Sequence, residues 1–229
     1  MIAFEVVRTR LSPRGYFGLQ LALGAFVLIG AGWLFGRIAE DVVNGGPLTF
    51  VDVRVAQWFH AHATPFWTRV MLAITHLHDP LPATAAVLLL AGFLIWRRNW
   101  YWLIGLSLTV PFGMLLNVLM QHAFHRIRPS FDNPLLVLSS DSFPSGHVAG
   151  ATLFYGVLAA MLVAQSGVWR WRVMVVLAAS ALVALVALTR IYLGAHYLSD
   201  VLAAFAQSVA WLTLCLTGLH TFWRRRTGT

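Results

Sequence analysis

Long apolar runs separated by short polar segments dominate the pattern of hydrophobic and polar positions in this chain. Each run comes close to the roughly 20 apolar residues that an α-helix needs to cross a bilayer. Six such runs occur, at Phe17–Phe35, Leu81–Trp96, Trp100–Met120, Val148–Ala164, Val173–Leu188 and Val201–Leu219. Because the bilayer core admits few backbone structures other than helices, the pattern predicts an all-α, polytopic membrane bundle with six transmembrane helices.

The segment between the first two runs, at about residues 48–78, is too polar to span a membrane. Its first part places Val51, Val55, Trp58 and Phe59 on one helical face and Asp52, Arg54, Gln57 and His60 on the other. Its second part begins with Thr64-Pro65, a favourable N-cap and first-turn pair. One stripe of that part carries Phe66, Val70, Ile74 and Leu77. We interpret the segment as one or two amphipathic helices at the outer interface, serving as a lid, a lipid-entry surface or a plain connector.

Composition supports a membrane protein with a single domain over residues 1–229. Hydrophobic residues make up 59% of the chain and charged residues only 10%, against about 25% charged in a soluble domain. The net charge of +8 comes entirely from arginine, since the chain has no lysine. These arginines cluster between apolar runs, which indicates membrane topology rather than nucleic-acid binding. Cys215 lies inside an apolar run and is expected to pack as a small hydrophobic residue.

The distribution of arginine predicts the orientation. With both termini in the cytoplasm, ten of the sixteen arginines face inward, accompanied by one acidic residue, Glu5. The inward-facing set is Arg8, Arg10, Arg14, Arg97, Arg98, Arg170, Arg172, Arg224, Arg225 and Arg226. This arrangement satisfies the positive-inside rule. It predicts a multi-pass membrane protein with both termini on the cytoplasmic side.

Two polar segments that carry candidate chemistry fall on one side of the membrane. With six spans, the loops after the third and fifth runs both emerge on the outer face. The first loop holds residues 121–147 and the second holds residues 190–200. Counting spans therefore brings together histidines, arginines and a carboxylate that are far apart in sequence.

The first loop ends in Pro144-Ser145-Gly146-His147, directly before an apolar run that is expected to be helical. Ser145 is the predicted N-cap, and a helix start offers free N–H groups and a positive dipole end to an anion. Gly146 lets a ligand approach the backbone closely, and His147 could give that ligand a proton. The alternative is an ordinary cap followed by an interfacial histidine.

The second loop carries Arg190, His196 and Asp200. The i, i+4 spacing of the last two predicts that they share one face of a helix, where the carboxylate can orient the imidazole. Arg190 supplies a charged fork that suits phosphate oxygens. The alternative is a structural ion pair between Arg190 and Asp200. In the first loop, Arg128-Pro129 adds a further cation, which could equally serve simple attraction to anionic headgroups.

These residues resemble the signature of the type 2 phosphatidic acid phosphatase (PAP2) superfamily, which has three parts. Pro-Ser-Gly-His is complete at residues 144–147, and the third part is similar at Thr189-Arg190, His196 and Asp200, with threonine in place of the usual serine. The first part, Lys-x6-Arg-Pro, ends in Arg128-Pro129 but has Gln121 at the lysine position. The motifs cover about 80 residues, and the six-span layout extends the resemblance over nearly the whole chain.

The resemblance implies a role for each matching residue. His196 would attack phosphorus and become a phosphohistidine, Asp200 would orient it, and His147 would protonate the leaving oxygen. Phosphate oxygens would be held by Arg128, Arg190, Ser145 and Gly146, with Gln121 replacing the usual lysine. The resemblance implies that no metal or other cofactor takes part. His122, His125 and Arg126 are candidates to replace the missing lysine charge.

The implied activity is hydrolysis of a lipid phosphate monoester or diphosphate at the outer face of a bacterial inner membrane. The substrates left open are phosphatidic acid, phosphatidylglycerophosphate, diacylglycerol diphosphate and undecaprenyl diphosphate. A lipid phosphotransferase with the same site and a non-catalytic lipid-binding or transport protein are the alternatives. The implied partners are the lipid substrate and the membrane, without nucleic acid. The sequence does not indicate an oligomeric state.

Overall fold

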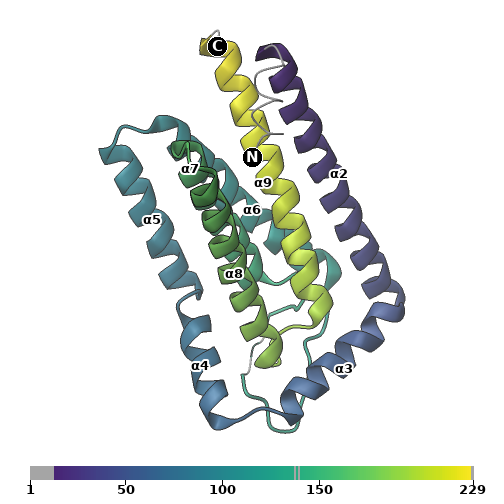
Figure 1. Ribbon diagram of the computed structural model, residues 1–229. Helices are drawn as coiled ribbons and strands as arrows, with labels where there is room; N and C mark the ends of the chain where they lie inside the picture. The colour runs from purple at the N-terminus through teal and green to yellow at the C-terminus, as the bar shows by residue number, and fades with distance from the viewer. Residues whose placement is uncertain (1–12, 137, 139, 228–229) are drawn as a thin grey trace.

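Helices account for nearly all of the structure (Figure 1). The computed structural model describes residues 13–136, 138 and 140–227, and no strand occurs among them. Eight helices form in this part of the chain: α2 (Pro13–Asn44), α3 (Pro47–Ala61), α4 (Pro65–His76), α5 (Pro80–Trp96), α6 (Trp100–Phe124), α7 (Gly146–Gln165), α8 (Trp169–Tyr192) and α9 (Leu198–Thr227). Each predicted apolar run lies inside one helix, so the predicted all-α membrane fold is confirmed.

Five helices, α2 and α6 to α9, are long and apolar enough to cross a membrane individually. The second predicted span corresponds to α5, which has 17 residues and reaches membrane length only together with α4. A bend of 44° separates these two helices. The described residues therefore provide five spans, or six when the bent pair is counted as one, and the prediction matches the higher number.

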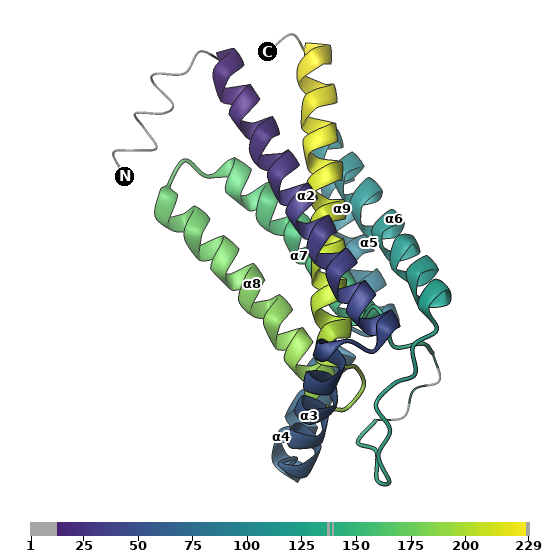
Figure 2. The ribbon, with the colours of Figure 1, turned by 90° about the vertical axis from the view of Figure 1, so that its right-hand side faces the viewer.

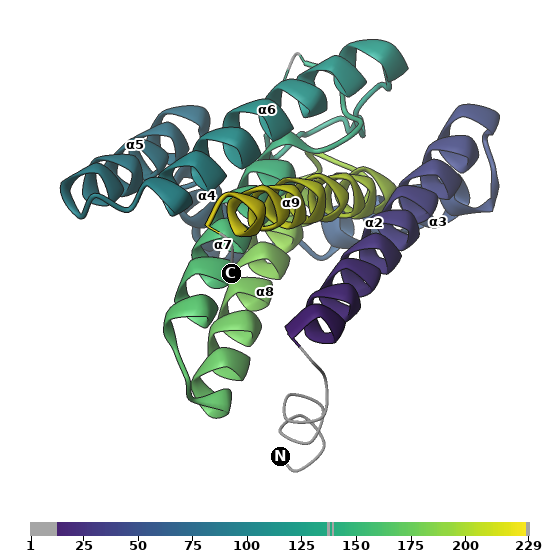
Figure 3. The same cartoon turned by 90° about the horizontal axis from the view of Figure 1, so that it is seen from above.

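Helix α9 lies at the centre of the bundle and packs against α2, α6 and α7 (Figures 2 and 3). Glycine allows the close approach. A Cβ at Gly113 of α6 would lie 2.6 Å from Cδ1 of Leu153 in α7 and 2.8 Å from Cδ1 of Trp211 in α9. Because lipid gives helices no hydrophobic reason to associate, close packing at small residues is a main source of bundle stability.

The two ends of the bundle differ in charge. The α5–α6 and α7–α8 connections lie at the same end as the last turns of α9 (Figure 1). That end carries Arg97, Arg98, Arg170, Arg172, Arg224, Arg225 and Arg226. Of the other residues expected at this side, Glu5, Arg8, Arg10 and the side chain of Arg14 lie outside the described part of the structure. Helix α3 and the α6–α7 and α8–α9 connections lie at the opposite end.

Helices α3 and α4 occupy the segment predicted to be amphipathic. On α3, Val55 and Phe59 of the predicted apolar face pack against the core, while Arg54 and Gln57 of the predicted polar face are exposed. Asp52 is an exception, because it belongs to the polar face and is fully buried.

Candidate active site

Three segments that are far apart in sequence meet at the end of the bundle beside α3 (Figure 1). They are the connection between α6 and α7, the end of α8, and the turn that leads into α9. The N–H of Ser145 donates to the carbonyl of Asp200 at 3.1 Å, which fastens the start of α7 to the first turn of α9. The convergence expected from counting spans is therefore observed.

His196 lies in the turn before α9 and not on the helix, which begins at Leu198. Gly194 in this turn has a φ of 66°, a left-handed conformation that favours glycine. The N–H groups of Ala195 and His196 both donate to the carbonyl of Arg190, at 3.0 and 3.2 Å. The prediction that His196 and Asp200 share a helical face is therefore wrong. The two side chains meet because the turn folds back on the first turn of α9.

The hydrogen bonds of His196 define its tautomer. The side chain is almost fully buried, and its Nδ1 lies 2.8 Å from the carbonyl oxygen of Ser142. A carbonyl can only accept, so Nδ1 carries the proton and donates. The other ring nitrogen, Nε2, faces Nη1 of Arg128 at 3.1 Å. Since a guanidinium can only donate, Nε2 is unprotonated and its lone pair accepts from Arg128.

His196 is neutral at physiological pH. Burial lowers its pKa to about 4, and the positive charges of Arg128 and Arg190 act in the same direction. The carboxylate of Asp200 opposes this shift without reversing it. Above about pH 4, therefore, Nε2 is unprotonated and able to act as a nucleophile.

Asp200 lies close to His196 but bonds mainly to other groups. Its Oδ2 is 3.6 Å from Nδ1 of His196, beyond an ordinary hydrogen bond. That oxygen instead accepts from Oγ of Ser142 at 2.5 Å and from the N–H of Tyr197 at 2.8 Å. Its Oδ1 accepts from Arg126 at 2.5 Å. Asp200 thus acts on His196 through its charge and through Ser142, whose carbonyl holds the imidazole.

Arg128 is fixed over the turn that carries His196 by backbone and side-chain acceptors. Its guanidinium donates to the carbonyl oxygens of Ser140, Asp141 and Ala195 and to Oγ of Ser140, at 2.5–3.0 Å. Burial lowers its pKa below the ordinary value, although nearby carboxylates oppose this. These hydrogen bonds therefore fix the positively charged guanidinium of Arg128 beside Nε2 of His196.

Two buried polar atoms next to this cluster have no hydrogen-bond partner among the described residues. They are Oγ of Ser145 and Nε of Arg190. Ser145 occupies the N-cap of α7, as predicted, without donating or accepting through its side chain. Arg190 is 1% exposed, donates through Nη1 to Thr75 at 2.7 Å and lies within electrostatic range of His196. Buried polar groups are rarely left unpaired, so these atoms are suited to meet a ligand.

His147 follows Gly146 in the first turn of α7 and is paired with a carboxylate. Its Nε2 lies 2.9 Å from Oδ1 of Asp79, and the other carboxylate oxygen lies 2.8 Å from Nδ1 of His76. Asp79 sits at the bend between α4 and α5. The bent helix pair therefore holds the predicted proton donor in position. Sequence reasoning missed this contact, and its only signal was an acidic residue at the edge of an apolar run.

Gln121 does not extend into open space. Its Nε2 donates to the carbonyl of Pro144 at 2.9 Å, and Asn117 donates to the same oxygen at 3.5 Å. A Cβ at Gly146 would lie 3.8 Å from Nε2 of Gln121. The glutamine thus lies beside the N-terminus of α7, where a longer charged side chain could reach an anion.

The three neighbours that could replace the missing lysine point elsewhere. His122 contacts the carbonyl of Val118 through Nδ1 at 2.8 Å, and His125 contacts Asp141 at 3.2 Å. Arg126 pairs with Asp200 and Asp52. None of them is directed by these contacts to the space beside Ser145.

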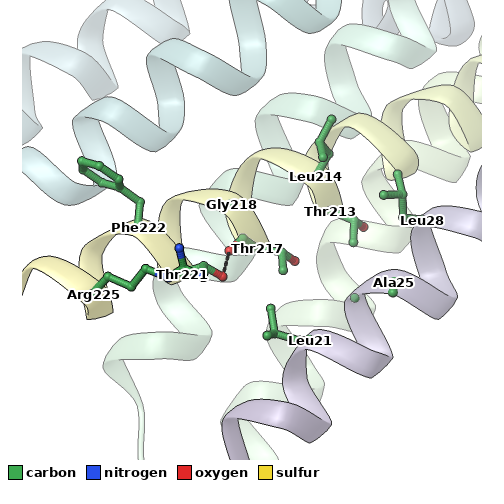
Figure 4. Close-up of a pocket in the computed structure, with 11 residues that line it drawn as sticks. Leu21, Ala25, Leu28, Thr213, Leu214, Thr217, Gly218, Thr221, Phe222 and Arg225 are labelled. Atoms are coloured by element: carbon green, nitrogen blue, oxygen red, sulfur yellow. Dashed lines mark hydrogen bonds between the residues drawn. The ribbon is translucent and has the colours of Figure 1, made fainter. Parts of the chain in front are cut away.

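A sizeable groove lies away from this cluster. A groove of about 580 Å³ lies between α2 and α9, lined by apolar residues such as Leu21, Leu28, Leu214 and Phe222 (Figure 4). On α9 it lies at least 13 residues from Asp200, which is roughly 20 Å along a helix. In the described part of the chain, no three His, Cys, Asp or Glu side chains are grouped to hold a metal ion. Independence from metal remains a prediction.

Comparison with known sequences identifies similar proteins. The model of the PAP2 superfamily matches residues 100–224. Phosphatidylglycerophosphatase B of Bacillus subtilis (strain 168) is 36% identical over 178 residues, which cover 76% of this chain and 86% of that protein.

Two solved structures are also similar. The crystal structure of the first transmembrane PAP2 type phosphatidylglycerolphosphate phosphatase from Bacillus subtilis superposes with a TM-score of 0.75 and 27% identity, covering 87% of this chain and 97% of that chain. Aquifex aeolicus LpxE gives a TM-score of 0.57 and 19% identity, covering 72% of this chain and 94% of that chain. The likeness to LpxE concerns the fold alone.

Proposed function

The chain belongs to the PAP2 superfamily, and from this premise we propose that it hydrolyses the phosphomonoester or diphosphate of a membrane lipid through a phosphohistidine at His196. Phosphatidylglycerophosphate is the proposed substrate, because the similar Bacillus subtilis proteins are described as phosphatases of that lipid. The protein is a multi-pass membrane protein. We place its site at the outer face of a bacterial inner membrane, since the arginine-rich end is the opposite one.

One observation carries the proposal. The unprotonated Nε2 of His196, which accepts from Arg128, lies among cations and unpartnered polar atoms from three segments. A phosphate placed there would pair with Arg128, Arg190 and the hydroxyl of Ser145. It would also meet the N-terminus of α7, where backbone N–H groups are free. A structural cap or ion pair does not explain the unpartnered atoms.

The first chemical step forms a bond between Nε2 and phosphorus while the bond from phosphorus to the ester oxygen breaks. The Nδ1–H bond to the Ser142 carbonyl holds the ring in the attacking orientation. Charge builds up on the phosphate oxygens, where Arg128 and Arg190 stabilise it. The departing lipid oxygen takes a proton from His147, which Asp79 orients.

The second step returns the enzyme to its starting state. His147, now deprotonated, takes a proton from water as the water oxygen attacks phosphorus. The bond between phosphorus and Nε2 breaks, inorganic phosphate leaves, and His196 is again neutral with its proton on Nδ1. The low pKa of His196 favours this step, because a weakly basic nitrogen is a good leaving group.

Phosphate release from a panel of lipid phosphates by the purified protein tests the proposal. We expect the highest kcat/KM with phosphatidylglycerophosphate. Orthovanadate, which mimics five-coordinate phosphorus, should inhibit, and EDTA should leave the rate unchanged. Loss of activity in EDTA that Mg²⁺ restores would overturn the metal-independent mechanism, and transfer of phosphate to an added lipid alcohol would favour a phosphotransferase.

Replacing Gln121 with lysine should restore a cation beside the bound phosphate. A charge-assisted hydrogen bond is roughly twice as strong as a neutral one, so we expect Gln121→Lys to bind orthovanadate about five times more tightly, with equal or higher kcat. Gln121→Met, which has similar length but neither charge nor hydrogen bond, is the matched control. Weaker vanadate binding by Gln121→Lys would show that Arg128 and Arg190 repel the added charge, and the superfamily role for this position would not apply.

A further inference from the structure

A buried carboxylate on α3, which is not part of the superfamily signature, contacts the proposed catalytic cluster. Asp52 is fully buried. Its Oδ2 accepts from Nη2 of Arg126 at 2.8 Å, while Nη1 of the same guanidinium donates to Oδ1 of Asp200 at 2.5 Å. One arginine thus bridges two carboxylates, one from α3 and one from α9. The pKa of Arg126 is raised: burial acts to lower it, but these two carboxylates outweigh burial.

Asp52 also binds the first turn of α9. Its Oδ1 accepts from the N–H of Ser199 at 2.8 Å, and its Oδ2 accepts from the Ser199 hydroxyl. The early N–H groups of a helix have no partner within the helix, so Asp52 caps α9 from another element. Nη1 of Arg126 donates to the Ser199 hydroxyl as well, at 2.6 Å. Helix α3 is therefore tied to the turn that carries His196.

Removing any one of these groups would leave a buried charge or donor unpaired. Side-chain exposure is 13% for Arg126 and zero for Asp52 and Asp200. Isolated charges are costly to bury, so three such groups persist only as a set. Stability alone does not require them at this position, because hydrophobic residues of similar volume often stabilise a core equally well.

We propose that Asp52 and Arg126 are positioning residues, which set the effective charge and the place of Asp200 behind the nucleophile His196. This inference rests on the proposed function only for the identity of the nucleophile. Arg126 offsets part of the negative charge of Asp200, and Asp52 in turn offsets part of the charge of Arg126. The proton affinity of His196 is therefore tuned by a residue on α3 that does not touch it.

The charges facing His196 come from several elements. Arg128 is in the α6–α7 connection, Arg190 on α8 and Asp200 on α9. Arg126 and Asp52 lie behind Asp200. Removing the cation of Arg126 exposes His196 to the full charge of Asp200 and should raise its pKa. Removing the anion of Asp52 leaves Arg126 to Asp200 alone and should lower that pKa.

The test uses the full-length protein in detergent micelles. The pKa of His196 is measured by NMR titration of labelled histidine, with its signal assigned by its absence from His196→Ala. Relative to wild type, we expect Arg126→Gln to raise the pKa of His196 by about one unit and Asp52→Asn to lower it by about half a unit. Removing a charge several ångströms from a titrating group in a protein shifts its pKa by roughly this amount. The double variant should lie between the two, about half a unit above wild type if the shifts add.

Three further variants distinguish a positioning role of Asp52 and Arg126 from a role in stability alone. Ser199→Ala removes hydrogen bonds to both residues without removing a charge, so kcat/KM should fall two- to fivefold with the His196 pKa unchanged. Arg126→Lys keeps the charge without the bridge and should hold the pKa near wild type. It also covers the case in which Arg126→Gln fails to fold. Arg54→Gln removes an exposed charge of α3 and should change neither quantity.

The outcomes distinguish the two proposals. Equal pKa values in Arg126→Gln and Asp52→Asn, or shifts of the same sign, would overturn the positioning role even if both variants were inactive. Where Arg126→Gln does not fold, Asp52→Asn still decides, because an unchanged or raised pKa contradicts the expected fall. A wild-type protein that releases no phosphate from lipids would instead overturn the proposed function, and the titrations would remain decisive for Asp52 and Arg126.

Discussion

His196→Ala is expected to abolish phosphate release, with a loss of at least about 10⁴-fold in kcat. The proposed nucleophile is removed, so no covalent bond to phosphorus can form at this position. In a comparable enzyme, loss of the nucleophile costs about 10⁶ in kcat. The remaining cations and the N-terminus of α7 should still bind phosphate, so orthovanadate binding should survive while turnover does not.

The measurement is kcat for phosphatidylglycerophosphate together with the melting temperature. His122→Ala is the matched control, because His122 is exposed and contacts only the carbonyl of Val118 among the bonds described. It should retain wild-type activity. Incubation of wild type with ³²P-labelled substrate and rapid quenching at alkaline pH should trap label on His196, and none on His196→Ala. Turnover of His196→Ala within tenfold of wild type would rule out the covalent mechanism.

The helical architecture could be predicted from the sequence because the physics of lipid is restrictive. A long apolar run that crosses a bilayer has to satisfy its own backbone hydrogen bonds and therefore forms a helix. All six runs accordingly appear as helices or parts of them. The N-cap at Ser145 was also predictable, because it combines a capping residue with a run that must be helical. Counting spans was enough to bring together the two loops that carry the candidate site residues.

Contacts within the site could not be predicted in the same way. Spacing alone placed His196 on a helix, whereas the left-handed turn at Gly194 places it before α9. Periodicity in α3 distinguished a polar from an apolar face but did not indicate that Asp52 of the polar face is buried. The burial of Asp52 depends on a partner, Arg126, that lies 74 residues away in sequence. Such pairings arise from tertiary structure and leave no local pattern.

Asp200→Asn is expected to lower kcat by about 10²- to 10³-fold. In a triad whose carboxylate accepts directly from the imidazole, this change costs about 10⁴ because the ring adopts the wrong tautomer. Here Oδ2 of Asp200 is 3.6 Å from Nδ1, and the carbonyl of Ser142 is the direct acceptor. The tautomer should therefore survive the substitution. What is lost is the negative charge that stabilises positive charge on His196, and loss of one such electrostatic contact costs about 10²–10³.

Ser142→Ala is the matched control for this prediction, because it removes the hydroxyl that bonds to Asp200 but keeps the carbonyl that holds His196. We expect less than a tenfold loss for it. The two variants are compared by kcat, vanadate binding and melting temperature. Asp200→Asn within tenfold of wild type would reduce Asp200 to an anchor for Arg126. A loss of 10⁴-fold or more, with an unchanged melting temperature, would show that the carboxylate moves onto Nδ1 when substrate binds, so that Asp200 and not the Ser142 carbonyl orients the nucleophile.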